Sequence, residues 1–430
     1  MAIGPWLTFK LYPPIAFGAL IAATTYLAKN VLKVSPRNLM AVALASSLYI
    51  LNLRISWDYQ RQLLGSVIMV LAIVVLESYR GRGAKCTLLA SLLLVLTSMA
   101  HEVTGVVAFV LALLLLVEAV ANRAGREIAV HFTALAVITA LLLWYWRILY
   151  TPNMYLGAAP PGVVSYPVYT AAAGEVISYL VVGYGLVLPP ALLVLTKPGY
   201  RYLKIAVVTL FLAGLSPLIA PYTAATAWYR FLIGAAPLMV PLAIAGLTTY
   251  GEGRATVIYV LLFAVVGIPF ILQYLYMYDL VAALTEFPPG LTPSPAIRPF
   301  LQDLYELSTY ISANISKADL ETPIMAQRHV ARWIHLGIRN PEPGRLIWIP
   351  YDPGISAVCN VMTNHNTTRI YIITTKDIEA LVREINTTQI ETCGPYSGED
   401  IDVKVRLLRD GTYKLYLVEV SSKQAGSITT

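Results

Sequence analysis

The sequence predicts a polytopic α-helical membrane protein of about ten spans, followed by a C-terminal extracytoplasmic α/β domain. Of its 430 residues, 57% are hydrophobic and only 13% are charged, whereas about 25% of the residues in a soluble domain are charged. Long apolar runs recur as far as residue 280, and a Pro-rich stretch then leads into a segment of ordinary composition. We therefore expect a transmembrane domain at 1–280, a linker at 281–295 and an extracytoplasmic domain at 296–430.

The apolar runs approach the ~20 residues that an α-helix needs to cross a bilayer. Only Ala100, His101 and Glu102 separate the fourth run from the fifth, so a single kinked segment is an alternative there. The ten predicted spans are 13–28, 39–53, 63–76, 86–100, 103–121, 131–150, 176–196, 203–221, 231–250 and 255–278.

The basic residues predict the direction in which the spans run. One set of alternate loops carries 12 Lys and Arg residues, and the other set carries 5, namely Lys10, Arg54, Arg61, Arg147 and Arg230. Because loops rich in Lys and Arg stay in the cytoplasm, we expect a multi-pass protein of the cell membrane with both termini outside. The net charge of +7 is spread in small packets between apolar runs. This distribution indicates membrane topology, and we expect no nucleic-acid partner.

The segment after residue 280 has the features of a small α/β domain. Helical spacing predicts helices at 296–313, 323–338 and 376–385, and strand-like runs occupy 345–351 and 369–374. The Asp-Gly pair within 409–412 predicts a hairpin between strands at 402–408 and 413–420. Glycosylation sequons begin at Asn314, Asn366 and Asn386, as expected outside the cell. Cys359 and Cys393 are candidates for a disulfide with Cα atoms within about 7 Å.

Charged residues at membrane surfaces are costly, so each is a candidate for function. The stretch 51–65 holds Asp58 between Arg54 and Arg61. Asp58 is either a solvated turn residue or a carboxylate for metal coordination or base chemistry. His101 and Glu102 open a span, where a carboxylate is favoured by the helix dipole; the alternative is a site that grips a polar head group. The other outward-facing candidates are Arg147, Glu175, Trp228 and Arg230.

Arg230 has two interpretations that the sequence does not separate. It follows Trp228 and Tyr229 at the outer start of a predicted span. A guanidinium there either anchors the helix in the interface or binds a lipid phosphate.

Several segments resemble the GT-C superfamily of membrane glycosyltransferases, which use polyprenyl-phosphate-linked sugars. The resemblance rests on SMAHEVTG (98–105), on AWYRFLIGAAPLMVPLAIAG (227–246), and on the tail segment HVARWIHLGIRNPEPGRLIWIPYDPG (329–354). It also rests on short spans joined by little loop. Protein O-mannosyltransferases and oligosaccharyltransferase catalytic subunits are members of this superfamily.

The resemblance implies a site on the outer face. Members carry a catalytic acid in the first external loop, and some carry a second acid in the next external loop. If one span were missing ahead of residue 1, Asp58 would be that second acid, with His101 and Glu102 in the same catalytic pocket. The resemblance implies a divalent metal, Mg²⁺ or Mn²⁺, at Asp58, and a lipid-linked sugar held by Arg230, Arg61, Arg54 and Trp228.

Residues 1–12 contain no Asp or Glu, so the first-loop acid is not present. The alternative is therefore a non-catalytic membrane scaffold, whose outer domain binds a membrane or envelope protein. A transporter ranks third, because we find neither internal repeats nor ionisable residues near the span midplanes.

Overall fold

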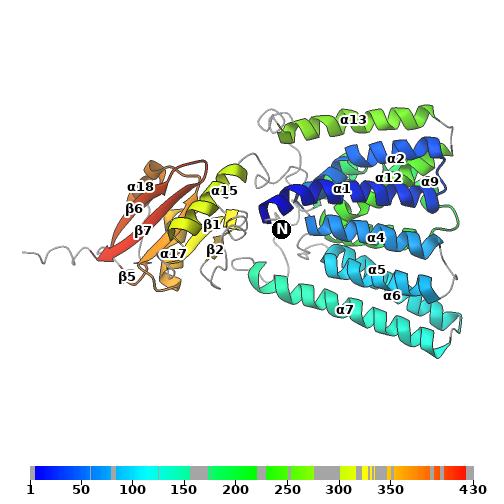
Figure 1. Cartoon of the computed structure of the whole chain (residues 1–430), viewed down its shortest axis with the longest axis horizontal. Helices are drawn as coiled ribbons and strands as arrows, with labels where there is room; N and C mark the ends of the chain where they lie inside the picture. Colours follow the sequence, from blue (N-terminus) through cyan, green and yellow to red (C-terminus); the bar gives the residue numbers. More distant parts are fainter. Residues whose placement is uncertain are drawn as a thin grey trace, which may run out of the picture. The chain divides into compact units, whose positions relative to one another are not determined.

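The computed structural model divides the chain into two compact units, residues 10–293 and residues 294–430, the second grouped with residues 1–9. The division lies within the predicted linker. The structure describes residues 5–58, 60–78, 84–123, 125–154, 173–174, 176–219, 229–249, 253–275, 301–315, 322–327, 330–331, 334, 346–349, 353–387, 392–397 and 401–422. Each unit is considered by itself (Figure 1).

The first unit is built from helices that lie side by side, with α7 and α13 at opposite edges (Figure 1). The apolar helix α12 lies inside the bundle, since every residue from Leu232 to Gly246 is buried. A helix that is apolar on all sides belongs inside a bundle, and α12 packs against α9, α10, α2 and α3. The helices are α1 (Pro5–Asn30), α2 (Pro36–Leu48), α3 (Ile50–Asp58), α4 (Gln60–Ser78), α5 (Ala84–Ala100), α6 (Glu102–Ala121), α7 (Arg126–Met154), the π-helix η1 (Tyr179–Gly183), α9 (Leu188–Leu195), α10 (Arg201–Gly214), α11 (Ser216–Ile219), α12 (Tyr229–Thr248) and α13 (Arg254–Leu275).

Each predicted span corresponds to helical structure, but fewer than ten helices are full-length spans. Among the described residues, five helices are long and apolar enough to cross a membrane, or seven if each of two bent pairs forms one span. The apolar helix α5 has 17 residues and is shorter than the ~20 residues that a span needs. The alternative of one kinked segment at 86–121 does not hold, since α5 and α6 pack against each other as two helices.

The two bent pairs join each other at their breaks. The first pair bends by 60° between α2 and α3, and the second by 87° between η1 and α9. A break leaves backbone carbonyl groups without helical partners in an apolar interior. Tyr49, at the first break, donates a hydrogen bond of 2.7 Å to the Gly183 carbonyl at the second. Tyr184 donates to the Leu232 carbonyl in α12. The tyrosine hydroxyls therefore satisfy carbonyls of neighbouring helices.

The 51–65 stretch is helical rather than a water-facing turn. All of it except residue 59 lies in α3 or α4. The bend at Tyr49 directs α3 into the bundle, where Arg54 is only 5% exposed and Ile55 is fully buried. Arg54 is therefore a buried residue of α3, whereas Arg61 at the start of α4 is exposed.

The second unit is an α/β domain with a five-stranded sheet in the order β2-β1-β3-β7-β6. Strands β1, β2 and β3 are parallel, and β7 pairs antiparallel with both β3 and β6. The hairpin predicted around Asp410-Gly411 is β6–β7. The elements are α15 (Leu301–Tyr310), η3 (Ile311–Ile315), β1 (Ile324–Gln327), β2 (Leu346–Ile349), α17 (Ile355–Asn364), β3 (Arg369–Thr374), α18 (Ile378–Thr387), β4 (Thr392–Cys393), β5 (Tyr396–Ser397), β6 (Ile401–Arg409) and β7 (Lys414–Ser422).

Side chains alternate between the two faces of this sheet, as the two-residue period of a strand requires. Ile370 and Ile372 of β3 join a core with α17 and α18, whereas Tyr371 and Ile373 join a core with α15. The sheet is therefore covered on both faces. Cys359 of α17 and Cys393 of β4 form a disulfide with a Cα–Cα distance of 4.3 Å, within the predicted reach.

One element of the tail differs from its prediction. Residues 324–327 form the strand β1, although helical spacing suggested a helix over 323–338. Ile324, Met325 and Ala326 are all buried, because β1 lies between β2 and β3. A short apolar run of this kind fits either a buried strand or a buried helix, and strand pairing decides between them.

Candidate functional site

Ionisable residues from three distant segments meet at one end of the helical unit. We call this region the His101 end and define it by Arg61, His101, Glu102 and Arg230. Arg61 begins α4, His101 and Glu102 lie at the α5–α6 junction, and Arg230 begins α12. Because successive helices run antiparallel, the start of α4 and the starts of α6 and α12 reach the same end. Among the predicted site residues whose side chains the structure describes, these four lie together.

His101 ends one helix and caps the next. Its backbone is extended, with φ −163° and ψ 146°, and its Nδ1 accepts a hydrogen bond of 3.2 Å from the Val103 N–H. Burial, followed by the nearby charges of Arg230 and Arg61, lowers the pKa of His101 to about 3. The imidazole is therefore neutral at physiological pH. Since Nδ1 is the acceptor, the ring carries its proton on Nε2.

Glu102 and Arg230 form a cross-helix ion pair. Arg230 Nη1 lies 3.4 Å from Glu102 Oε1, and the two side chains are 20% and 36% exposed. Gln62, fully buried on α4, donates a hydrogen bond of 2.7 Å to the Arg230 carbonyl. Gln62 is not among the predicted site residues; the signal for it is an amide directly after Arg61, at the edge of the apolar run that begins at residue 63.

The helices behind this site approach closely. A Cβ added at Gly65 of α4 would lie 2.4 Å from Thr104 Oγ1 of α6, and one at Gly234 of α12 would lie 3.2 Å from Gln62 Nε2. Small residues at such crossings allow helices to pack backbone to backbone. The ionisable groups are thus carried on closely packed helices rather than on loops.

The charges at the His101 end suit an anion. Two guanidinium groups face one carboxylate and a neutral imidazole, which leaves a net positive charge. Among the described residues, no three His, Cys, Asp or Glu side chains gather to hold a metal ion. Divalent ions such as Mg²⁺ and Mn²⁺ take several oxygen ligands. Asp58, at which we expected such an ion, has a side chain outside the described residues, so the metal site stays a prediction.

The other predicted site residues are either outside the described residues or in the α/β domain. The side chains of Asp58 and Arg147, and all of Glu175 and Trp228, lie outside the described residues. Asn314 on η3 and Asn366 are both exposed, and Asn366 has a left-handed backbone with φ 47°. Asn386 lies in α18, but its side chain is outside the described residues. Glycosylation at the three sequons stays a prediction.

A second polar cluster occupies the opposite ends of α4 and α6. We call it the Glu118 end and define it by Glu77, Glu118, Arg201 and Tyr202. Glu118 pairs with Arg201 and accepts a hydrogen bond of 2.7 Å from the Tyr202 hydroxyl. Glu77 Oε1 accepts a hydrogen bond of 3.0 Å from the Leu203 N–H in the first turn of α10. These contacts fasten α4 and α6 to α10.

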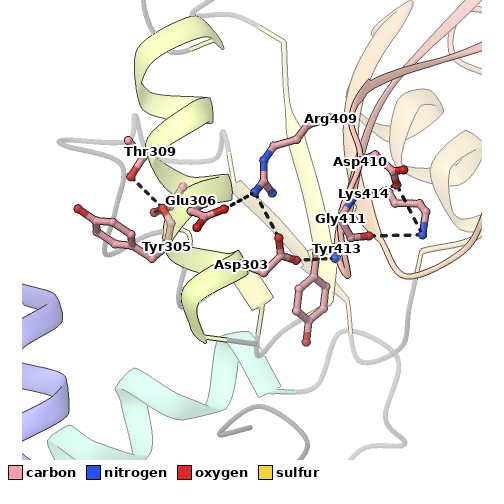
Figure 2. Close-up of polar contacts among 10 residues, drawn as sticks. Asp303, Tyr305, Glu306, Thr309, Arg409, Asp410, Gly411, Tyr413 and Lys414 are labelled. Atoms are coloured by element: carbon pink, nitrogen blue, oxygen red, sulfur yellow. Dashed lines mark hydrogen bonds and ion pairs between the residues drawn. The ribbon is translucent and has the colours of Figure 1, made fainter. Parts of the chain in front are cut away.

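The α/β domain has a polar cluster of its own, between α15 and the turn of the β6–β7 hairpin (Figure 2). Arg409 Nη2 lies 3.2 Å from Asp303 Oδ1 and 3.3 Å from Glu306 Oε2. Asp303 Oδ2 accepts a hydrogen bond of 2.9 Å from the Tyr413 N–H. Both Asp303 oxygens are thus engaged by the domain itself, so this cluster holds the hairpin turn against α15.

Together these features describe a mostly helical protein with a small C-terminal α/β domain. It combines apolar helices long enough to cross a membrane, a separate α/β domain, and a positively charged group of residues at one end of the helices. No family model matches the chain, and no curated protein gives a significant match.

Proposed function

We propose that the protein is a membrane protein that binds a lipid-linked, anionic sugar at the His101 end. In this proposal it is a GT-C-like glycosyltransferase of the outer membrane face, or a relative that has lost the transfer step. The observation that carries the proposal is the gathering of Arg61 and Arg230 beside neutral His101 at one end of apolar helices.

The charge balance indicates where the substrate's phosphate would bind. Guanidinium is the natural partner of a phosphate at a membrane interface. Gln62 donates a hydrogen bond to the backbone carbonyl of Arg230, and Glu102 forms an ion pair with the Arg230 guanidinium. Its charge is therefore positioned before a ligand arrives, which reduces the entropy lost on binding. A polyprenyl phosphate would place its phosphate here and its chain along the apolar helices.

Asp58 is the carboxylate that we assign to the transfer step. It ends α3, and α4 begins two residues later, so its Cα lies within about 11 Å of that of Arg61. In transfer, this carboxylate would accept the proton of the acceptor hydroxyl while the hydroxyl oxygen attacks the sugar C1. The bond from C1 to the phosphate oxygen breaks, and polyprenyl phosphate leaves with the electron pair.

The alternative is a membrane scaffold whose α/β domain binds a membrane or envelope protein. One observation favours it: Glu102 is engaged by Arg230, and His101 serves as a helix cap. Both residues then have structural roles that need no ligand.

Binding of a short-chain polyprenyl phosphate to the purified full-length protein separates the two functions. Arg230→Gln is expected to weaken binding about tenfold or more, because a hydrogen bond to a charged group contributes about 1.5–3 kcal/mol. The matched control is Arg201→Gln, which breaks the other Arg–Glu pair at the Glu118 end and is expected to leave binding unchanged.

Equal binding by the wild type, Arg230→Gln and Arg201→Gln would reject the site and favour the scaffold. A loss of binding in Arg230→Gln alone supports the site. Asp58→Asn then tests the transfer step: binding retained with loss of sugar transfer supports the assigned acid, whereas unchanged transfer removes it.

A further inference from the structure

Three consecutive helices have ionisable residues at their ends with the same spacing. In α4, α5 and α6 the flanking ionisable residues are 16 positions apart: Arg61 and Glu77, Lys85 and His101, and Glu102 and Glu118. A rise of 1.5 Å per residue makes each interval about 24 Å long. Tilt would shorten its projection on the membrane normal further. The apolar part of these helices is therefore shorter than the ~30 Å hydrocarbon core of a typical bilayer.

The three carboxylates among these end residues are tied to neighbouring helices. Glu102 is paired with Arg230 at one end of α6, and Glu118 is paired with Arg201 at the other. Glu77 of α4 holds the first turn of α10. A long side chain can often reach the interface from a deeper position, but these carboxylates are short and bound in place.

The exposed surface of α7 gives a second measure of the length of the apolar part. Its charged start, Arg126 and Glu127, is followed by an exposed apolar face. Trp144 and Tyr145, the last residues of α7 whose side chains the structure describes, are 65% and 54% exposed. Exposed Trp and Tyr are typical of the membrane–water boundary. The interval from Glu127 to Trp144 is about 26 Å at helical rise.

We propose that the helical unit is matched to a thin lipid bilayer, with a hydrocarbon core of about 24 Å, and that it thins a bilayer of ordinary thickness around itself. The partner is a lipid surface of defined thickness. The proposal rests on the membrane placement that the proposed function assumes. A hydrophobic belt shorter than the bilayer core is accommodated by bilayer thinning at a modest cost per Å.

The test uses the full-length chain reconstituted in phosphatidylcholine vesicles with short, medium or long monounsaturated acyl chains. The thermal unfolding midpoint is expected to be highest in the short-chain vesicles and to fall by several degrees as the chains lengthen. The double variant Lys85→Leu with Glu127→Leu extends two exposed apolar faces. The acyl-chain length at which its thermal midpoint is highest is therefore expected to increase. The control, Lys404→Leu, removes an exposed charge from β6 and leaves the optimum unchanged.

The outcomes are distinguishable. Protein that floats with the vesicles but is most stable in medium or long chains, or equally stable in all of them, overturns the thickness match while leaving membrane placement intact. Protein that does not float with any vesicle overturns membrane placement, and with it both this inference and the proposed function.

Discussion

At the residue scale, His101 is the residue whose chemistry is most altered by the fold. Its neighbour Glu102 pairs with Arg230, and its own Nδ1 caps α6. A charged imidazole would lie buried beside Arg230 and Arg61, so the fold keeps the ring neutral. His101, Arg61 and Arg230 form the anion site that we propose. The protonation state of His101 is therefore a useful probe of that site.

This predicts a pH dependence of stability. The folded-state pKa of His101, about 3, lies below the ordinary value of about 6.5. The unfolded chain therefore binds a proton more readily, and the folded state loses stability as the pH falls from about 6.5 towards 3. Between pH 7 and pH 4, the thermal midpoint in detergent is expected to fall more for the wild type than for His101→Asn, which can still cap α6 but does not titrate. Equal falls would contradict the assigned environment.

Part of this site could be predicted from single residues. A His-Glu pair between apolar runs and an Arg at the start of a span are visible in the sequence, because charge near hydrocarbon is costly. Gln62 is not predicted, since a single amide at the edge of an apolar run carries little weight until its partner is known. Arg54 follows the predicted span 39–53 and is therefore expected at the outer surface, but the bend at Tyr49 turns α3 inwards.

At the scale of elements, close helix crossings hold the bundle together. Gly267 of α13 is one example. A Cβ there would lie 2.1 Å from the carbonyl oxygen of Leu48, the last residue of α2 before the bend. The atom in the way is backbone, so it cannot move by a change of rotamer.

Gly267→Ala is therefore expected to destabilise the protein by about 1–3 kcal/mol, as overpacking of a core does. The matched control is Gly18→Ala in α1, where an added Cβ meets nothing within 4 Å. That variant is expected to be neutral or slightly stabilising, because Ala favours helix over Gly. Thermal midpoints of both purified variants check the difference, and equal losses would mean that the crossing does not constrain the bundle.

The elements were predicted unequally well. Apolar length located helices at all ten runs, and the Asp-Gly turn located β6 and β7. Hydropathy does not show where a helix changes direction, however, so the sequence does not predict the breaks at Tyr49 and after Gly183. The 323–338 run was assigned the wrong type at its start, because strand β1 depends on pairing with β2 and β3, which are distant in sequence.

At the scale of the whole molecule, the distribution of basic residues predicts which side each unit occupies. A reporter fused after residue 281 is expected outside the cell, and one inserted near residue 82 is expected in the cytoplasm, because 12 of the 17 loop Lys and Arg residues lie on the latter side. Accessibility of both reporters in intact cells measures this. Finding both on the same side would overturn the orientation, and with it the outer location of the proposed site.

The sequence by itself indicated the apolar helices of the first unit and the separate C-terminal domain, since long apolar runs and a change of composition after residue 280 need no three-dimensional information. It also indicated that Cys359 and Cys393 share a domain. Only the tertiary structure decided that Arg61, the His101-Glu102 pair and Arg230 lie together. Those residues span 169 positions of sequence, and nothing local links them. Their meeting depends on antiparallel helices that pack α4, α6 and α12 against one another, and packing of this kind is a property of facing surfaces rather than of any one segment.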